Sequence, residues 1–118
     1  MKTKSQLWSF DAQRVATIDP ERLVGYDVEA SDGHIGKIDE ASTETSRRYL
    51  VVDTGFWIFG KKRMVPAGLV SKIDTEDELV LIDMTKDQIK SAPDYDDQGR
   101  YSDDDYDGTF GSYYRGLP

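Results

Sequence analysis

The residues best suited by type to catalysis are Asp53-Thr54-Gly55, which directly follow an apolar run. An aspartate in this setting suits aspartic-protease chemistry, in which two carboxylates, one from each copy of a homodimer, share one proton. The neighbouring sequence argues against that chemistry, because Phe56 and Trp57 stand where such a site needs a small residue, and a glycine-rich flap is missing. We therefore expect a β-turn in which the Asp53 carboxylate accepts local backbone N–H groups.

Two other groups of residues suggest metal binding, and both lack a full ligand set. His34 is the only histidine in a chain without cysteine, which argues against a zinc site. The run from Asp103 to Gly108 places glycine sixth, as a calcium loop does, but its twelfth position is Tyr114 instead of glutamate. We expect no catalytic residue, no metal and no cofactor, and we interpret His34 as a polar residue at a hairpin.

Length and charge limit the possible classes of protein. A chain of 118 residues corresponds to one small domain with tails. The net charge of −8 argues against direct nucleic-acid binding, because neutralising phosphates requires clustered Lys and Arg. The N-terminus lacks the apolar run of a secretory signal, and no run reaches the ~20 apolar residues of a membrane helix. We expect a cytoplasmic protein without a membrane span.

Short runs of alternating apolar and polar residues fill the middle of the chain, bounded by Gly, Asp and Ser. Alternation with a period of two is typical of strands with one buried face. Several such runs, spaced by roughly 8–12 residues, predict a small all-β barrel or sandwich. Thr85 is placed to cap a helix that Pro93 ends. The expected strands are 26–30, 35–41, 49–52, 64–66, 69–74 and 78–82, and the expected helix is 86–92.

The composition divides the chain into a flexible N-terminal arm (1–18), a barrel domain (19–93) and an acidic tail (94–118). The tail carries seven aspartates against two arginines, and such a segment is expected to bury too little apolar surface to order itself. We therefore expect a disordered tail. Its spaced aromatic residues suit a short linear recognition segment; they are Tyr101, Tyr106, Phe110, Tyr113 and Tyr114.

Five short pieces of sequence follow one another in a characteristic order. They are Leu23-Val24-Gly25, Asp32-Gly33 with Ile35-Gly36, Tyr49–Val52, Val65-Pro66, and Thr85–Ile89 with Ala92-Pro93. With this order, residues 19–93 resemble the PRC-barrel domain. That family includes the photosynthetic reaction-centre H subunit, the C-terminal barrel of the ribosome maturation factor and many free-standing small prokaryotic proteins. The resemblance is to the free-standing type, because the chain has neither a membrane anchor nor room for a second barrel. It implies a strongly bent antiparallel barrel that serves as an interaction or scaffold module without a shared active site.

The run from Phe56 to Arg63 carries the strongest interface signal. Neighbouring side chains on a strand face opposite ways, so one barrel can bury at most about half of an apolar run. Contiguous exposed aromatic residues usually mark an interface. We therefore expect a homodimer through Phe56, Trp57, Ile58 and Phe59. The basic residues Lys61, Lys62 and Arg63 are expected to form a contact loop that could receive an acidic segment, including the chain's own tail.

These features predict a non-enzymatic protein–protein interaction module: a PRC-type homodimer whose acidic tail recognises an unidentified protein partner. The alternative is an accessory factor in RNA or ribosome metabolism, with a basic ribosomal protein as the partner of the acidic surface.

Overall fold

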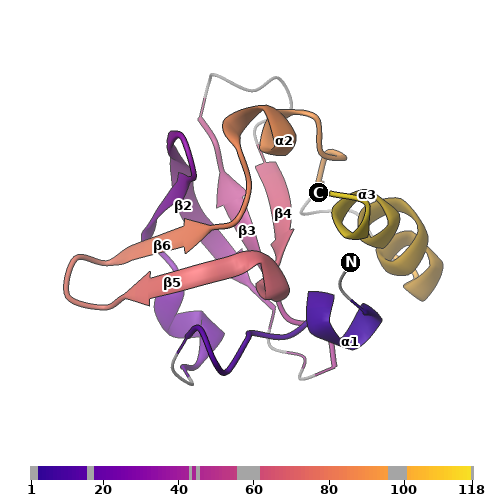
Figure 1. The fold of residues 1–118 in the computed structure, drawn as a ribbon, viewed down its shortest axis with the longest axis horizontal. Helices are drawn as coiled ribbons and strands as arrows, with labels where there is room; N and C mark the ends of the chain where they lie inside the picture. Colours follow the sequence, from indigo (N-terminus) through magenta and orange to yellow (C-terminus); the bar gives the residue numbers. More distant parts are fainter. Residues whose placement is uncertain are drawn as a thin grey trace.

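The computed structural model describes residues 3–15, 18–42, 44, 46–55, 62–95 and 101–117. Most of the fold is one six-stranded sheet with the strand order β4-β3-β2-β1-β6-β5 (Figure 1). This sheet, followed by one short helix, confirms the predicted all-β class. The strands are β1 (Asp27–Ala30), β2 (Gly33–Ala41), β3 (Tyr49–Asp53), β4 (Lys62–Pro66), β5 (Val70–Asp74) and β6 (Leu79–Ile82), and the short helix after them is α2 (Lys86–Lys90).

Strand pairing is antiparallel throughout with one exception, the parallel pair of β1 and β6. The predicted antiparallel sheet therefore includes one parallel pair. The cause is the connection after β4, the 3-10 turn η2 (Ala67–Leu69), which bends the chain without reversing it. Strand β5 therefore continues in the sense of β4, and its hairpin with β6 sets β6 parallel to β1. This three-residue connection also joins the two edge strands of the sheet, which requires a strong bend.

Gly36 lies within β2, and a glycine inside a strand predicts a bulge or a close approach of backbones. A Cβ atom at Gly36 would lie 2.0 Å from the backbone oxygen of Asp53, so no other residue fits there without movement. The register of β1 against β2 shifts next to this position, between Val28 and Glu29. Both observations confirm the prediction, because bulges sharpen the twist and bend of a strand.

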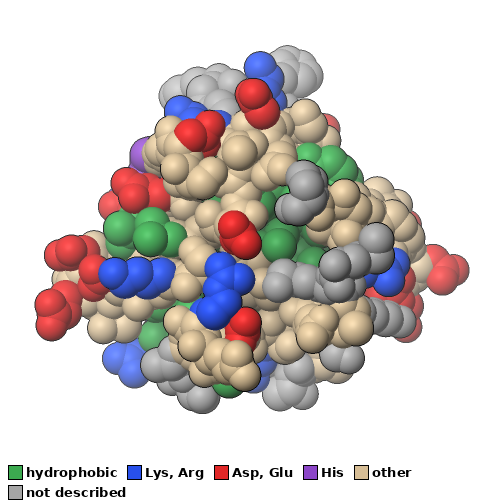
Figure 2. Space-filling model, viewed as in Figure 1, with side chains coloured by type: hydrophobic (Ala, Val, Ile, Leu, Met, Phe, Trp, Pro, Cys, Tyr) green, Lys and Arg blue, Asp and Glu red, His purple; other side chains and the backbone are tan. Residues whose placement is uncertain are grey.

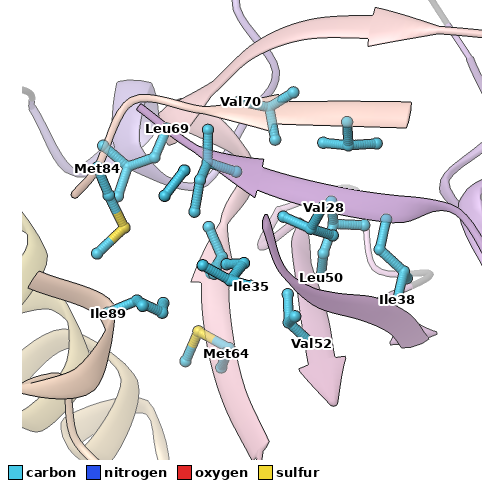
Figure 3. Packing of buried hydrophobic residues seen from close by; sticks show 14 of the residues in the cluster. Val28, Ile35, Ile38, Leu50, Val52, Met64, Leu69, Val70, Met84 and Ile89 are labelled. Carbon is cyan, nitrogen blue, oxygen red and sulfur yellow. The ribbon is translucent and has the colours of Figure 1, made fainter. Parts of the chain in front are cut away.

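The core lies on the concave side of the sheet. Apolar side chains from β1, β2, β3, β5 and α2 point toward one another there (Figure 3). Helix α2 begins as predicted: the Thr85 hydroxyl accepts the Gln88 N–H, and the Gln88 side chain accepts the Thr85 N–H. This capping box satisfies backbone donors at the helix start and directs Ile89 into the core. The labelled core residues are Val28, Ile35, Ile38, Leu50, Val52, Met64, Leu69, Val70, Met84 and Ile89.

The two ends of the chain lie together beside β4 (Figure 1). We call residues 3–15 and 101–117 the terminal layer. It contains α1 (Lys4–Leu7), the π-helical turn η3 (Asp105–Phe110) and α3 (Gly111–Arg115). Helix α1 packs closely on η2, since a Cβ at Gly68 would lie 2.1 Å from the Gln6 carbonyl oxygen.

This arrangement differs from the expected flexible arm and disordered tail. Leu7, Trp8, Phe110 and Tyr114 are all buried. The aromatic residues supply the reason, since each can bury about 150–250 Å² of surface, and together they offset the acidic composition of the tail.

Candidate functional site

The structure describes only some of the predicted site residues. Phe56, Trp57, Ile58, Phe59 and Lys61 lie outside the described residues. Lys62 and Arg63 belong to strand β4, and the C-terminal aromatic residues belong to the terminal layer. The Asp53 carboxylate accepts the Gly55 N–H at 2.9 Å, as predicted for the side chain of this motif.

Arg63 is a buried anchor, with 3% of its surface exposed, and not part of a solvated loop. Its Nε donates to the Ile89 carbonyl at 3.0 Å and its Nη2 to the Lys90 carbonyl at 3.2 Å. Its Nη1 forms an ion pair of 2.6 Å with Asp94, the first residue of the acidic segment. The last carbonyls of a helix lack partners within the helix, so a cation satisfies them and favours the negative end of the helix dipole. Arg63 thereby fixes both α2 and the exit of the chain toward the terminal layer.

Lys62 points to a different partner. Its Nζ forms a 2.6 Å ion pair with Asp39 on β2. Of the predicted basic contact residues, the described pair therefore contacts acidic residues of this same chain.

The C-terminal aromatic residues face the body of the protein. The Tyr114 hydroxyl donates to the Met64 carbonyl, and the Tyr113 hydroxyl donates to the Gln88 carbonyl. Met64 lies on β4, an edge strand of the sheet. A second edge carbonyl, that of Lys62, accepts the Tyr95 N–H at 3.3 Å. Because exposed edge strands offer unpaired backbone groups to other chains, these contacts protect β4.

Trp8 joins the N-terminal part of this layer to the C-terminal part. Its ring meets Tyr106 edge-on at 6.0 Å and Tyr49 at 6.4 Å, and its carbonyl accepts the Arg48 N–H at 2.8 Å. Tyr101 and Phe110 continue the cluster, with ring centroids 5.3 Å apart. Edge-on aromatic pairs of this kind add about 0.5–1.5 kcal/mol beyond the area that they bury.

Arg47 lies in the middle of this aromatic cluster. Its guanidinium stands 4.4 Å from the centre of the Tyr106 ring and 5.8 Å from that of Trp8. It also forms ion pairs with Asp103 at 3.2 Å and with Asp107 at 3.8 Å. The cation is thus held between aromatic faces and two carboxylates of the tail. Sequence reasoning missed Arg47, although Arg47-Arg48 directly precede a central strand.

Burial changes the acidity of the tyrosines in this layer. It raises the pKa of Tyr49 to about 12, and it raises the pKa values of Tyr106 and Tyr114 further. The cause is desolvation, which disfavours a phenolate in an apolar environment. The hydroxyl of Tyr114 therefore stays protonated and remains a hydrogen-bond donor throughout the physiological range.

A local sequence signal marks the start of the C-terminal helical segment. The Ser102 hydroxyl accepts the Asp105 N–H at 3.2 Å, and the Asp105 carboxylate accepts the Ser102 N–H at 2.9 Å. A Ser followed three residues later by an acid is a known helix-start pattern. Residues 103–110 are accordingly helical and do not form a calcium loop. Within the described part of the chain, no group of three or more metal-ligating side chains is placed to hold a metal ion.

A hollow of about 510 Å³ opens at the corner where β2 meets the turn after β3. Its lining includes Val24, Ile35, Ile38 and Gly55, with His34 at the hairpin beside them. Val24 is 48% exposed, which sets it apart from the other described large apolar side chains. Gly55, which precedes Phe56 in the sequence, is one of the lining residues.

No family model matches the sequence, and no curated protein matches it. Among solved structures, the fold is similar to RimM of Pseudomonas aeruginosa, a protein assigned to 16S ribosomal RNA processing, with 18% sequence identity and a TM-score of 0.49. The match covers 66% of this chain and 50% of that chain, so it spans half of the length of RimM. Membership of the PRC-barrel family stays a prediction from the sequence. No helix among the residues that the structure describes is long and apolar enough to cross a membrane.

Proposed function

We propose that the protein is a non-enzymatic protein–protein interaction module that forms a homodimer at the corner around Val24 and Gly55. The observation that carries the proposal is the hollow of about 510 Å³ there, with Val24 exposed at its side. The four apolar residues 56–59 follow this corner directly in sequence.

The chemistry of this corner supports an interface. An interface combines an apolar centre with a polar rim. Val24 is the exposed apolar side chain of this corner, and His34, Lys37, Asp39 and Asp53 among the lining residues would supply the polar rim. A second copy suits this surface because the apolar residues on each copy would cover those of the other across a two-fold axis.

The test is the sedimentation of the full chain. Wild type is expected to sediment as a dimer, while Trp57→Glu and Val24→Glu sediment as monomers, because each places a charge in an apolar interface. Ser31→Glu, at an exposed turn, is the matched control and is expected to stay dimeric. A monomeric wild type, or a dimer that both charged variants leave intact, would rule out this interface.

A second candidate function is supported by a different feature, the acidic tip of the β5–β6 hairpin. Glu76, Asp77 and Glu78 are exposed there, and acidic side chains gather at this end of the molecule (Figure 2). Backbone N–H groups, that of Asp77 first, hold the pKa of Asp74 below its usual value. This surface is complementary to a basic protein, and it favours an accessory factor in ribosome metabolism that binds a basic ribosomal protein.

Co-sedimentation with ribosomes distinguishes this candidate. Binding is expected at low salt and should be lost at high salt, because charge attraction between exposed groups is screened. Glu76→Lys combined with Asp77→Lys should abolish it, while Glu21→Lys combined with Glu44→Lys, the same charge change at exposed sites elsewhere, should weaken it far less. Equal losses in the two double variants would show that only net charge matters.

A further inference from the structure

The C-terminal segment 101–117 contacts the rest of the protein as a ligand contacts a receptor. We propose that the surface beneath it, formed by Trp8, Arg47, Tyr49 and the edge strand β4, also accepts this segment from a second copy of the chain. Two copies would thereby exchange their C-terminal segments. This contact is separate from the interface proposed at Val24 and Phe56–Phe59.

The polar contacts of the segment with the body define what this surface recognises. Arg47 binds the carboxylates of Asp103 and Asp107, at 3.2 and 3.8 Å. Two backbone carbonyls of the body, on Met64 and Gln88, accept tyrosine hydroxyls from the segment. The recognised ligand is therefore an acidic helix with tyrosines, and a second copy carries the same ligand.

The apolar contacts fit the same description. Phe110 of the segment is buried, with its ring 6.3 Å from that of Tyr95. The Tyr106 ring lies 6.0 Å from Trp8 and 5.8 Å from Tyr49. All of these contacts would re-form when the segment comes from another copy, so exchange conserves their free energy. This is why swapping of an identical element is a low-cost route to a dimer.

The segment has the properties of a unit that can separate from the body. A cleft of about 630 Å³ lies between the two, lined by Tyr114, Arg115 and Leu117 on one side and by Phe10 and Leu69 on the other. The segment's packing against the body is therefore incomplete on this side.

The helix of the segment also depends on docking. It contains Gly108 and Gly111 and ends at Gly116, and each interior glycine costs about 1 kcal/mol of helix stability relative to alanine. A helix this short is marginal in water by itself. The segment is thus expected to fold when it docks and to unfold when it leaves, on whichever copy it docks.

Charge reversal can force the exchange, because it makes docking on the same copy unfavourable. One full-length variant carries Arg47→Glu, and the other carries Asp103→Arg with Asp107→Arg. Each variant alone places like charges together. In a mixture, the acidic segment of the Arg47→Glu variant can pair with the unchanged Arg47 of the other variant. The segment that carries Asp103→Arg and Asp107→Arg can in turn pair with the glutamate at position 47 of the first variant. Both variants also carry Trp57→Glu, so the interface proposed above cannot produce a dimer.

The expected result is that each variant alone sediments near the monomer mass of 13.4 kDa, while the mixture sediments at about twice that mass. The matched control is the exposed ion pair of Lys37 and Asp27, 2.9 Å apart. A mixture of Lys37→Asp and Asp27→Lys, in the same background, should stay monomeric. A monomeric mixture of the Arg47 and Asp103/Asp107 variants would overturn the proposal.

A second measurement avoids charge reversal in the buried layer. The chain has no cysteine, so Ser112→Cys and Ser31→Cys, both at exposed positions, give single labelling sites on the segment and on the body. Donor-labelled and acceptor-labelled chains, both with Trp57→Glu, are incubated together at high concentration. Energy transfer that rises with time supports exchange. Energy transfer that stays at the level of freshly mixed dilute chains overturns the proposed exchange. Because both chains carry Trp57→Glu, this result does not depend on whether the Trp57 interface exists.

Discussion

The sheet and the terminal layer both bury apolar side chains, but they do so with different kinds of residues and contacts. The sheet buries branched residues such as Val28 and Ile38 along regular strands. The terminal layer packs aromatic rings against the Arg47 guanidinium and anchors them through tyrosine hydroxyls that donate to backbone carbonyls. The first arrangement follows a period that can be read along the chain. The second arrangement depends on contacts between residues that are far apart in the sequence. Through these contacts both ends of the chain become part of the fold, although their composition is typical of flexible tails.

Phe110→Ala gives the largest expected effect and tests whether the terminal layer is as integral as the sheet. The side chain is 1% exposed, and removing a buried phenylalanine costs about 3–5 kcal/mol of unfolding free energy. Urea denaturation should show a loss similar to that of Leu50→Ala in the sheet, for which about 2–5 kcal/mol is expected. Thr109→Ala, at the exposed neighbouring position, should change little. A small effect of Phe110→Ala would mean that the layer contributes little to stability.

Arg63→Met is expected to give the next largest loss of stability, and it tests the connection between the sheet and the terminal layer. It removes the donors to the Ile89 and Lys90 carbonyls and the ion pair with Asp94. Each hydrogen bond that involves a charged group contributes about 1.5–3 kcal/mol, so thermal unfolding should move to a clearly lower midpoint. Lys62→Met, which breaks the neighbouring ion pair with Asp39, is the control, with about 0–1 kcal/mol expected. Equal shifts for the two variants would contradict the anchoring role of Arg63.

Arg47→Met should have a smaller effect that depends on salt. It removes two ion pairs with the tail and the contacts with the Tyr106 and Trp8 rings, together about 1–2 kcal/mol. The difference from wild type in chemical denaturation should shrink as salt rises, because the ion pairs are partly exposed to solvent. Arg22→Met, at an exposed position, should show no such dependence. A loss that is the same at all salt concentrations would assign the effect of Arg47 to packing.

A pH titration gives the smallest effect and is specific to the terminal layer. Burial raises the pKa of Tyr49 from 10.0 to about 12. The stability that comes from keeping this phenol protonated is fully present below pH 10 and is lost as the pH rises toward 12, because the unfolded chain ionises first. Tyrosinate absorbance should therefore show a late group of tyrosines, and Tyr49→Phe should remove one of them. Titration of all tyrosines near the ordinary value would contradict their burial in this layer.

The sequence allowed prediction of the sheet, its turns and α2, because alternation and caps are local signals. It did not predict the terminal layer, because the acidic composition of residues 94–118 concealed a helix that only packing stabilises. Two local signals pointed to it. Ser102 and Asp105 form a helix-start pattern, and the unbroken apolar run from Tyr49 to Val52 indicates a strand covered on both faces. Strand β3 is indeed buried at three consecutive positions, Leu50 to Val52. The aromatic residues 56–59 lie outside the described residues, so their role stays a prediction.

Residues 101–117 fold on the body of the protein and complete its structure. Amide hydrogen exchange of the full chain, measured by NMR at neutral pH, tests whether this segment is folded. The amides of Tyr106 and Gly116, which donate to the Ser102 and Ser112 carbonyls, are expected to exchange as slowly as the Ile89 amide of α2, and Arg47→Glu should speed up their exchange selectively. Exchange of these amides at the rate of an unstructured peptide in the wild-type chain would show that the segment does not fold on the body.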